Sequence, residues 1–476
     1  MSSSFIGFLM MSNTSETLLA ADGTPLRKKL AQALFQSKLR AFGLAAPLLA
    51  FVIVSFIVPI LILLWQGIYD DDYATDMPNI SQVLEEWDGY EAVSEKMYEA
   101  LVRDFIVAMS IDRALTTRAG VRVNREISGA ISLHKKLMRS VGKLKLSYDG
   151  KEQKAKSIFR ALAKEDKNRN YILSPAERSE IGKELATDAV KKYAPFEQLV
   201  LKSSKKWSNI EIWRAMKVAS RTYSPAYLAA SLDYNYTFDG KFEKRDEDRQ
   251  IHILLFFRTL EISLVVTIAC LLLGYPVAYL LAGLPVRSAN LLLILVLLPF
   301  WTSLLVRTTA WIAMLQGQGV LNDLFVVFGF ATDDDRFSLI YNKTGTLIAM
   351  THILLPFMIL PLYSVMKTIP PSYVRAARSM GATNWTSFWR IYFPQSVPGI
   401  GAGALLVFIL AIGYFITPAL VGGQDGIMIS NMIDFHMRKS LNWNLAAALG
   451  LVLLVFVLFL YWLYDRVVGI DNMKLG

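Results

Sequence analysis

The residue types and spacing best suited to a specific contact lie in one segment, residues 370–395, between two long apolar runs. Its first two residues are prolines, which end an incoming helix, and Ser372 can cap a new one because its hydroxyl accepts from free backbone N–H groups. Small side chains on the new helix would allow a partner surface to approach closely, and Gly381 would end the helix where a Cβ is costly. The expected face comprises Tyr373, Ala376, Ala377 and Met380. The segment therefore predicts docking of another protein, and the alternative is an ordinary amphipathic connector.

A second short helix is expected from about Asn384. It carries aromatic residues toward Pro394, and Ile391 precedes that proline at an Ile-x-x-Pro spacing. The aromatic residues are Trp385, Phe388, Trp389 and Tyr392.

The sequence contains no pattern for catalysis. A phosphate-binding loop of the form Gly-x4-Gly-Lys-Ser/Thr is absent. Cys270 is the only cysteine, so no disulfide can form within the chain and no thiolate metal site is expected. The histidines are scattered along the chain at His134, His252, His352 and His436. We therefore expect no enzyme activity, no catalytic residues, no metal and no cofactor of the chain's own.

One acidic residue lies clearly within an apolar run, and it could attract a cationic solute. Glu261 is near the end of its run, and buried acids in a membrane are costly and usually functional. Aromatic rings could face an ammonium group, although such rings more often form the interfacial belt. The alternative for Glu261 is a pair with Arg258 at the interface. The candidate solute pathway comprises Glu261, Trp301, Trp311, Tyr414 and Thr417.

A separate polar stretch, residues 166–177, places Asp, Asn, Asn, Ser and Glu at positions 1, 3, 5, 9 and 12 of an EF-hand-type calcium loop. Tyr171 stands where the sharp turn needs glycine, and a left-handed conformation is costly for tyrosine. The favoured interpretation is a polar turn in which Ser174 caps a helix that begins at Pro175. Calcium binding stays open.

Long apolar runs lie on either side of segment 370–395, and a membrane that these runs cross would position it. The chain has 476 residues, of which 54% are hydrophobic, and the apolar residues gather in runs that reach the ~20 residues needed to cross a bilayer. Six spans are predicted: Leu44–Trp65, Leu254–Ala282, Leu291–Leu315, Thr346–Met366, Gly399–Leu420 and Leu445–Tyr464. Prolines that could kink them are Pro276, Pro299, Pro356, Pro361 and Pro418. A further apolar stretch, residues 320–330, is too short to span and reads as an interfacial or re-entrant helix.

The basic residues that flank these runs set the orientation. With six spans, the basic flanks before the first run, after the second and after the fourth fall on one side, which the positive-inside rule makes the cytoplasm. Both termini are therefore expected in the cytoplasm, and the net charge of +10 needs no nucleic acid to explain it. These flanks include Arg27, Lys28, Lys29, Arg287, Lys367, Arg375, Arg378 and Arg390.

The predicted domains follow from these runs. Residues 1–43 form a cytoplasmic tail, within which residues 25–40 are expected as a basic amphipathic helix on the inner membrane face or else as a disordered basic tail. Whether Met1 or Met11 is the true start stays open. Residues 44–65 form the first span, residues 66–252 a large, mainly helical extracytoplasmic domain, and residues 253–470 a five-helix core.

The segment 370–395 resembles the coupling loop of permeases from binding-protein-dependent ABC importers, often written EAA-x3-G-x9-I-x-L-P. The matching residues are Arg375, Ala376, Ala377, Gly381, Ile391 and Pro394. Arg375 stands where the family usually has glutamate, which puts the salt bridge of that glutamate in doubt. Residues 253–315 and 345–470 resemble spermidine/putrescine-type permeases in phrases such as residues 271–280, 354–363 and 417–423. About half of the chain is covered.

This resemblance implies an all-α polytopic permease of the bacterial inner membrane that moves a small polyamine-like or related solute inward by alternating access. It implies four kinds of partner: an ABC ATPase dimer that hydrolyses ATP with Mg²⁺, a second homologous permease, a periplasmic solute-binding protein and the lipid bilayer. Whether the permease pair is a homodimer or a heterodimer, which solute is carried, and what residues 66–252 do stay open. The alternatives are an ion-coupled secondary transporter, for which inverted repeats would be expected, and a membrane-anchored sensor.

Overall fold

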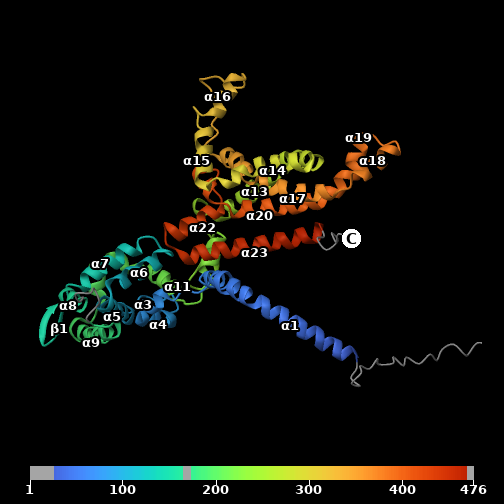
Figure 1. Ribbon diagram of the computed structural model, residues 1–476. Coiled ribbons are helices and arrows are strands. Elements are labelled where there is room, and N and C mark those ends of the chain that lie inside the picture. The colour runs from blue at the N-terminus through green and yellow to red at the C-terminus, as the bar shows by residue number, and fades with distance from the viewer. Residues whose placement is uncertain (1–25, 165–172, 469–476) are drawn as a thin grey trace, which may run out of the picture. The chain divides into compact units, whose positions relative to one another are not determined.

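The computed structural model describes residues 26–164 and 173–468, and it is mostly helical (Figure 1). The chain divides into two compact units, residues 1–63 and 64–476. In the first unit, α1 (Leu26–Val52) continues through a π turn (Ile53–Ile57) into α2 (Val58–Trp65). The π turn comes just before Pro59, which has no N–H to donate, and such a turn absorbs the missing bond. The predicted amphipathic helix is therefore continuous with the first span rather than separate from it, and Pro25 lies outside the described residues.

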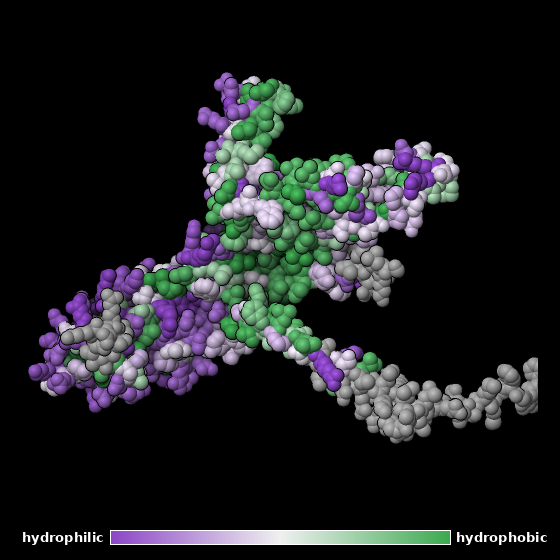
Figure 2. Space-filling view, in the orientation of Figure 1, coloured by the Kyte–Doolittle hydropathy of each residue, from purple (hydrophilic) through white to green (hydrophobic). Residues whose placement is uncertain are grey.

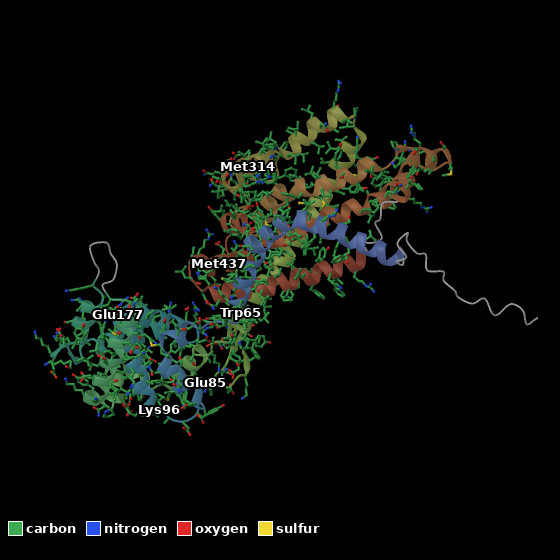
Figure 3. All side chains as sticks on the ribbon, turned by 60° about the horizontal axis from the view of Figure 1, so that its bottom comes forward. Trp65, Glu85, Lys96, Glu177, Met314 and Met437 are labelled. Carbon is green, nitrogen blue, oxygen red and sulfur yellow. The ribbon has the colours of Figure 1, made fainter. Side chains whose placement is uncertain are left out.

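The segment between the first two spans folds around its own core. Helix α5, most of whose residues are buried, packs against α4 and α9, while α6 packs on α7. The edge of Tyr98 meets the ring of the fully buried Trp213 at 5.1 Å between centroids. Charged side chains such as Glu85, Lys96 and Glu177 cover this segment (Figure 3), and its surface is mainly hydrophilic (Figure 2). The elements are α3 (Asp72–Asp76), α4 (Pro78–Glu86), α5 (Glu95–Ile111), α6 (Arg113–Asn124), α7 (Ala130–Val141), β1 (Lys145–Tyr148), β2 (Lys151–Lys154), α8 (Ala155–Leu162), α9 (Pro175–Tyr193), α10 (Glu197–Ser203), a 3-10 turn (Lys205–Ser208), α11 (Ile210–Ala219), α12 (Ala226–Ser231), β3 (Tyr234–Tyr236), β4 (Phe242–Lys244) and a 3-10 turn (Glu247–Arg249). The two strand pairs are antiparallel hairpins.

A buried ionic network ties the start of this segment to its interior. Asp70, five residues after the end of α2, lies 2.8 Å from the Nε of Arg122 on α6, and both side chains are almost fully buried. The hydroxyl of Tyr227 on α12 donates to the same carboxylate, and Arg122 also pairs with Glu126 at 2.7 Å. Because removing one partner from a buried pair leaves an uncompensated charge, this network holds the three elements in one arrangement.

Asp104 gives this segment a pH-dependent stability. Its carboxylate on α5 accepts from the backbone N–H of Asn79 at 3.1 Å and of Ile80 at 2.7 Å, and from the amide of Asn79 at 2.6 Å, so it caps α4. Burial raises the pKa of Asp104 from 3.8 to about 7, against the opposing effect of these hydrogen bonds. Between pH 3.8 and about 7, Asp104 is therefore protonated to a greater extent in the folded chain than in the unfolded chain, and the stability that this residue contributes falls as pH rises through that window.

We expect the stability of the native protein relative to Asp104→Asn to shrink by roughly 1 kcal/mol per pH unit across this window. Thermal unfolding of the purified full chain at several pH values measures it. His134→Gln is the matched control, for which the expected change of stability with pH has the opposite sign, because burial lowers the pKa of His134 from 6.5 to about 4. The stability from His134 is present above pH 6.5 and is lost as pH falls toward 4. A difference between native protein and Asp104→Asn that did not change with pH would contradict this account.

Most of the remaining helices are apolar, and they include most of the candidate spans. Within residues 26–164 and 173–468, five helices are long and apolar enough to cross a membrane, and a sixth span arises there only if a bent pair is counted as one. The five are Phe42–Trp65, His252–Gly283, Lys343–Thr368, Asn384–Gly413 and Trp443–Arg466. The elements after residue 251 are α13 (His252–Gly283), α14 (Val286–Trp301), α15 (Leu304–Leu315), α16 (Val320–Val327), α17 (Lys343–Thr368), α18 (Pro371–Ser379), α19 (Asn384–Ser387), the π turn η4 (Phe388–Tyr392), α20 (Phe393–Gly413), α21 (Ile416–Val421), α22 (Ile429–Arg438) and α23 (Trp443–Val468). Helices α13, α17 and α20 pack together as the centre of this part.

Two of the predicted spans differ from the structure. The third, predicted as one helix over 291–315, is broken at Thr302 and Ser303, and α14 meets the helix pair α15–α16 at 92°. Pro299 has no N–H to donate to the carbonyl one turn earlier in α14. Arg307 donates to carbonyls at the end of this helix, those of Pro299 and, at 3.1 Å, of Thr302. The fifth, predicted over 399–420, runs instead over Asn384–Gly413 and leaves Pro418 in the short helix α21. The domain boundaries proposed from the sequence remain predictions.

Candidate coupling loop and solute pathway

The segment 370–395 forms a short helix whose ends are set by proline and glycine. Pro371 is the first residue of α18, and Pro370 is its N-cap without any side-chain cap. The expectation that Ser372 caps this helix is therefore wrong, because Ser372 is already inside the first turn. Proline at the first helical position needs no cap for its own nitrogen, since it has no N–H.

Gly381 ends α18 in the way the sequence predicts. Its φ is +91°, in the left-handed region that favours glycine. Its N–H donates to the carbonyl of Arg378 at 2.9 Å, and the N–H of Ala382 donates to the carbonyl of Ala377 at 3.0 Å. These two bonds form a Schellman motif, which satisfies the last carbonyls of the helix and turns the chain sharply.

The second expected helix begins at Asn384, as predicted, but it does not end near Pro394. Thr383 caps α19 by accepting from the N–H of Thr386 at 3.2 Å. The helix then continues through η4 into α20, so that Ile391 lies in the π turn and Pro394 in the first turn of α20. The π turn again comes just before a proline, and the second half of segment 370–395 is thereby continuous with the candidate span Asn384–Gly413.

An aromatic cluster fixes this continuous helix to α13. Tyr392 meets Tyr279 edge to face at 5.0 Å, and Phe388 meets Tyr279 at 5.8 Å. The hydroxyl of Tyr275 lies 3.0 Å from that of Ser396. The sequence pointed to the aromatic residues of the loop but missed their partners on α13, which are more than one hundred residues earlier in the chain. The helix from Asn384 to Gly413 is therefore held against α13 near its start.

The exposed face of α18 differs from the predicted face by one residue, Ala377. Ala377 is buried, at 5% exposure, whereas Tyr373 and Met380 are 52% and 82% exposed and Ala376 is exposed as well. Helix α18 packs on α19 and η4, which cover Ala377. The surface that remains open to a partner therefore consists of Tyr373, Ala376 and Met380.

Glu261, the acidic residue of the predicted pathway, is compensated within the chain. Its carboxylate pairs with the ammonium group of Lys343 at the start of α17. The predicted alternative partner, Arg258, instead donates to the carbonyl of Gln424 at 2.7 Å. Glu261 is therefore not an isolated anion.

Two of the other pathway residues are brought together around α15. The indole N–H of Trp311 donates to Nδ1 of His352 on α17 at 3.2 Å, and the hydroxyl of Thr417 on α21 lies 3.4 Å from that of Thr308 on α15. Tyr414 lies just before α21; its side chain is hydrogen-bonded to that of Thr417, and its carbonyl accepts from Ser430 at 2.7 Å. The structure assigns Trp301 no contact with this group; its side chain is 85% exposed at the end of α14.

Two of the histidines that are scattered in the sequence are neighbours in the structure. The rings of His252 and His436 lie 6.3 Å apart, and Nδ1 of His252 is 2.8 Å from the carboxylate of Asp233. Burial, with the positive charges near it, lowers the pKa of His436 to about 4. No group of three or more potential metal ligands occurs within residues 26–164 and 173–468.

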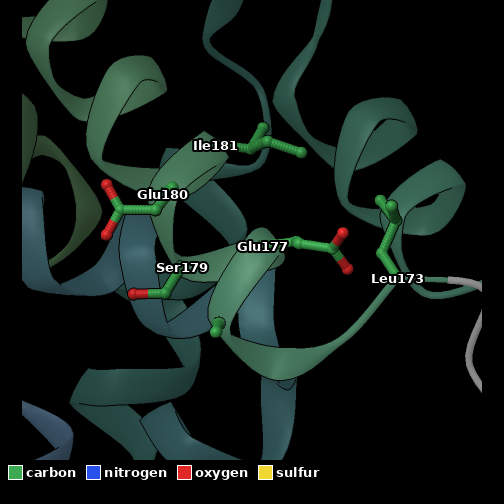
Figure 4. A pocket seen from close by; sticks show the side chains of 6 residues that line it. Leu173, Glu177, Ser179, Glu180 and Ile181 are labelled. Carbon is green, nitrogen blue, oxygen red and sulfur yellow. The ribbon is translucent and has the colours of Figure 1, made fainter.

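The calcium-loop pattern falls mostly on residues 165–172, which lie outside the described part of the chain. The favoured interpretation is confirmed for the part that can be seen. Ser174 caps α9, which begins at Pro175, and the Glu177 carboxylate accepts from the backbone N–H of Ser174 at 2.7 Å in a capping box. A hollow of about 660 Å³ lies beside this turn and is lined by Leu173, Ala176, Glu177, Ser179, Glu180 and Ile181 (Figure 4). The cap uses Glu177, and Glu180 pairs with Lys183 at 2.6 Å, so both carboxylates of the hollow have partners within the chain.

Comparisons with known proteins found similarity in the apolar, C-terminal part of the chain. Residues 271–468 match the family model of the binding-protein-dependent transport system inner membrane component. The spermidine/putrescine transport system permease protein PotB of Escherichia coli (strain K12) is 34% identical over 222 residues, which are 46% of this chain and 80% of PotB. The inner membrane ABC transporter permease protein YdcU of the same organism is 32% identical over 213 residues, or 43% of this chain and 68% of YdcU. A crystal structure of a bacterial alginate ABC transporter, in complex with an alginate pentasaccharide-bound periplasmic protein, covers 46% of this chain and 79% of its own at 20% identity and a TM-score of 0.37.

Proposed function

The chain belongs to the family of binding-protein-dependent transport system inner membrane components, and from this premise we propose that its loop 370–395 couples solute import to a separate ATPase. The chain is a multi-pass inner-membrane permease of an ABC importer of the polyamine type, a transport component that works with an ATPase and a periplasmic binding protein. This assignment replaces the two alternatives, an ion-coupled transporter and a sensor.

The observation that best supports coupling is the construction of α18. A helix with fixed ends presents Tyr373, Ala376 and Met380 outward, and it is joined through α19 and η4 to the span of α20. The aromatic contacts of Tyr279 then tie this span to α13. Such an element is stiff enough to transmit a push from a partner, whereas a flexible loop would absorb it.

The proposed cycle uses these parts in order. A loaded binding protein docks on the outer side, and ATP binding with Mg²⁺ closes the ATPase dimer. The movement of the ATPase displaces α18, and the helices that α18 is linked to rearrange so that the pathway opens inward. A second homologous permease completes the pathway, as the resemblance to importer permeases implies.

The topology that fits this cycle has six spans, with α14 and the α15–α16 pair counted as one broken span. Both termini then lie in the cytoplasm, on the same side as the basic residues after α13 and α17. The segment between the first two spans lies outside, where long polar segments translocate largely regardless of charge.

The proposed solute is a small organic molecule, polyamine-like or related, as the names of the relatives suggest. Because Lys343 compensates Glu261, this chain alone offers no isolated acid in its pathway for a cation. Selection by charge is therefore proposed to reside mainly in the binding protein. A screen of solutes against the cognate binding protein would identify the cargo.

Cysteine cross-linking tests the coupling role. The only native cysteine, Cys270, is buried within α13, so an introduced thiol reacts against a low background. We expect Met380→Cys, at a position that is 82% exposed, to cross-link to the ATPase and to react with a membrane-impermeant reagent only in inverted vesicles. The matched control, Tyr90→Cys, is also exposed and should react from the outside. Labelling of Met380→Cys from the outside, or no cross-link to a co-assembled ATPase, would refute the proposal.

A further inference from the structure

A pocket of about 630 Å³ lies between α18 and the ends of the spans α13 and α17. Its lining combines basic side chains with apolar ones. The residues that carry the argument are Tyr279 and Leu280 of α13, Lys367 of α17, and Val374, Arg375 and Arg378 of α18. None of the residues that line this pocket is acidic.

The basic residues leave an uncompensated positive charge in the pocket. The ammonium group of Lys367 donates to the carbonyls of Ala282 at 3.2 Å and of Leu284 at 3.1 Å, which end α13. Arg375 and Arg378 form no ion pair and no side-chain hydrogen bond with any residue in the described ranges of the chain. Two guanidinium groups one helical turn apart, with no partner, are suited to bind one anionic group such as a phosphate.

The other wall of the pocket belongs to the surface of a membrane span. Leu280 lines the pocket and is 57% exposed, and Leu273, seven residues earlier on the same face of α13, is 55% exposed. A molecule bound in the pocket would therefore meet positive charge at one end and an apolar span at the other.

The basic face of α18 is not the face proposed for the ATPase. At 100° per residue, Val374, Arg375 and Arg378 lie on one side of the helix, and Tyr373 and Met380 lie on the opposite side. An acidic residue of the ATPase that approached the outward face would therefore not be directed at the two arginines. The basic face is turned toward the ends of the spans, where lipid headgroups lie.

We propose that this pocket binds the headgroup of an anionic phospholipid, with the phosphate at Arg375 and Arg378 and the acyl chains along Leu280 and Leu273. Basic pockets between membrane helices are a known means of holding anionic headgroups. Arg375, which departs from the usual coupling-loop pattern, is then a lipid contact rather than an ATPase contact. The proposal concerns the face of α18 opposite to the ATPase contact, so either proposal can fail while the other stands.

The test uses the purified full-length permease in detergent, with bound lipid counted by native mass spectrometry. Phosphatidylglycerol, phosphatidylcholine and inorganic phosphate serve as probes. We expect phosphatidylglycerol to bind tighter than phosphatidylcholine by roughly 25-fold, about fivefold for each arginine. Arg375→Gln with Arg378→Gln should abolish this preference, and the conservative change of both to lysine should keep most of it. The matched control is Arg390→Gln, because Arg390 lies in the same loop, is exposed and does not line the pocket.

Four results would overturn the proposal. The first is equal binding of the two lipids by the native chain. The second is an unchanged preference in the double glutamine variant, and the third is the same loss in Arg390→Gln. The fourth is competition by inorganic phosphate as strong as that by phosphatidylglycerol, which would indicate a site for free anions. If the double variant kept its lipid preference but lost co-purification with the ATPase, the basic face would be a protein contact instead.

Discussion

Replacing Gly381 by tryptophan is expected to reduce ATP-driven solute uptake at least about tenfold while the permease still inserts into the membrane. The φ of +91° at this residue is strained for any side chain with a Cβ, by about 1–2 kcal/mol. The Schellman hydrogen bonds from Gly381 and Ala382 would weaken, and the turn that sets the angle between α18 and α19 would change. Uptake by the assembled transporter in vesicles, with membrane insertion measured in parallel, gives the result.

The control for this prediction is Gly381→Asn, since asparagine tolerates the left-handed conformation better than other residues with a side chain. No atom lies within 4 Å of the position a Cβ would occupy at Gly381, so a small side chain meets no clash. We expect the asparagine variant to keep uptake within about threefold of the native level. Normal uptake by the tryptophan variant would mean that the direction of α18 does not matter for transport.

Replacing Gly399 by leucine is expected to prevent the permease core from folding. A Cβ on Gly399 would lie 3.0 Å from the Cβ of Val365 and 3.3 Å from the Cα of Leu362, so the backbones of α20 and α17 are too close for a side chain. Close approach through small residues is what holds helices together in a membrane, where lipid is as apolar as leucine. Overpacking of this kind costs ~1–3 kcal/mol or more, and here backbone atoms cannot move aside. The yield of monodisperse protein after detergent extraction measures the loss.

The control for this second prediction is Ala402→Leu, three residues later in the same helix. Ala402 is exposed, so its side chain is directed away from α17. This control therefore introduces a leucine into the same helix without a clash. We expect near-native yield from this variant. Equal yields from Gly399→Leu and Ala402→Leu would show that α20 and α17 do not depend on this close contact.

The loop 370–395 was well predicted where its structure is local. The glycine in the left-handed conformation at Gly381 and the helix start at Asn384 were predicted, because each depends on residues within one turn. The cap of α18 was expected at Ser372 and lies at Pro370 instead. The burial of Ala377 was not predicted, because it depends on how α19 and η4 fold back onto α18. Helical spacing alone places Ala376 and Ala377 on the same face, and only packing distinguishes them.

The candidate pathway was predicted less well, because each of its contacts joins distant parts of the chain. Glu261 pairs with Lys343 instead of Arg258, and Trp311 contacts His352. The break in the third span could have been suspected from Pro299, but Arg307 as the donor that satisfies the broken end could not. A sequence shows that a group needs a partner, but it does not show which of several distant residues supplies it.

The sequence by itself determined that this chain is a helical membrane permease and which segment resembles a coupling loop, because span length, proline and glycine act over one or two helical turns. The tertiary structure alone decided which face of α18 is open, that α14 and α15 are bent apart, that the aromatic loop is held by Tyr279, and that two unpaired arginines face a membrane span. Those features arise from side chains that meet only after segments far apart in the chain have packed, and no local pattern specifies such a meeting.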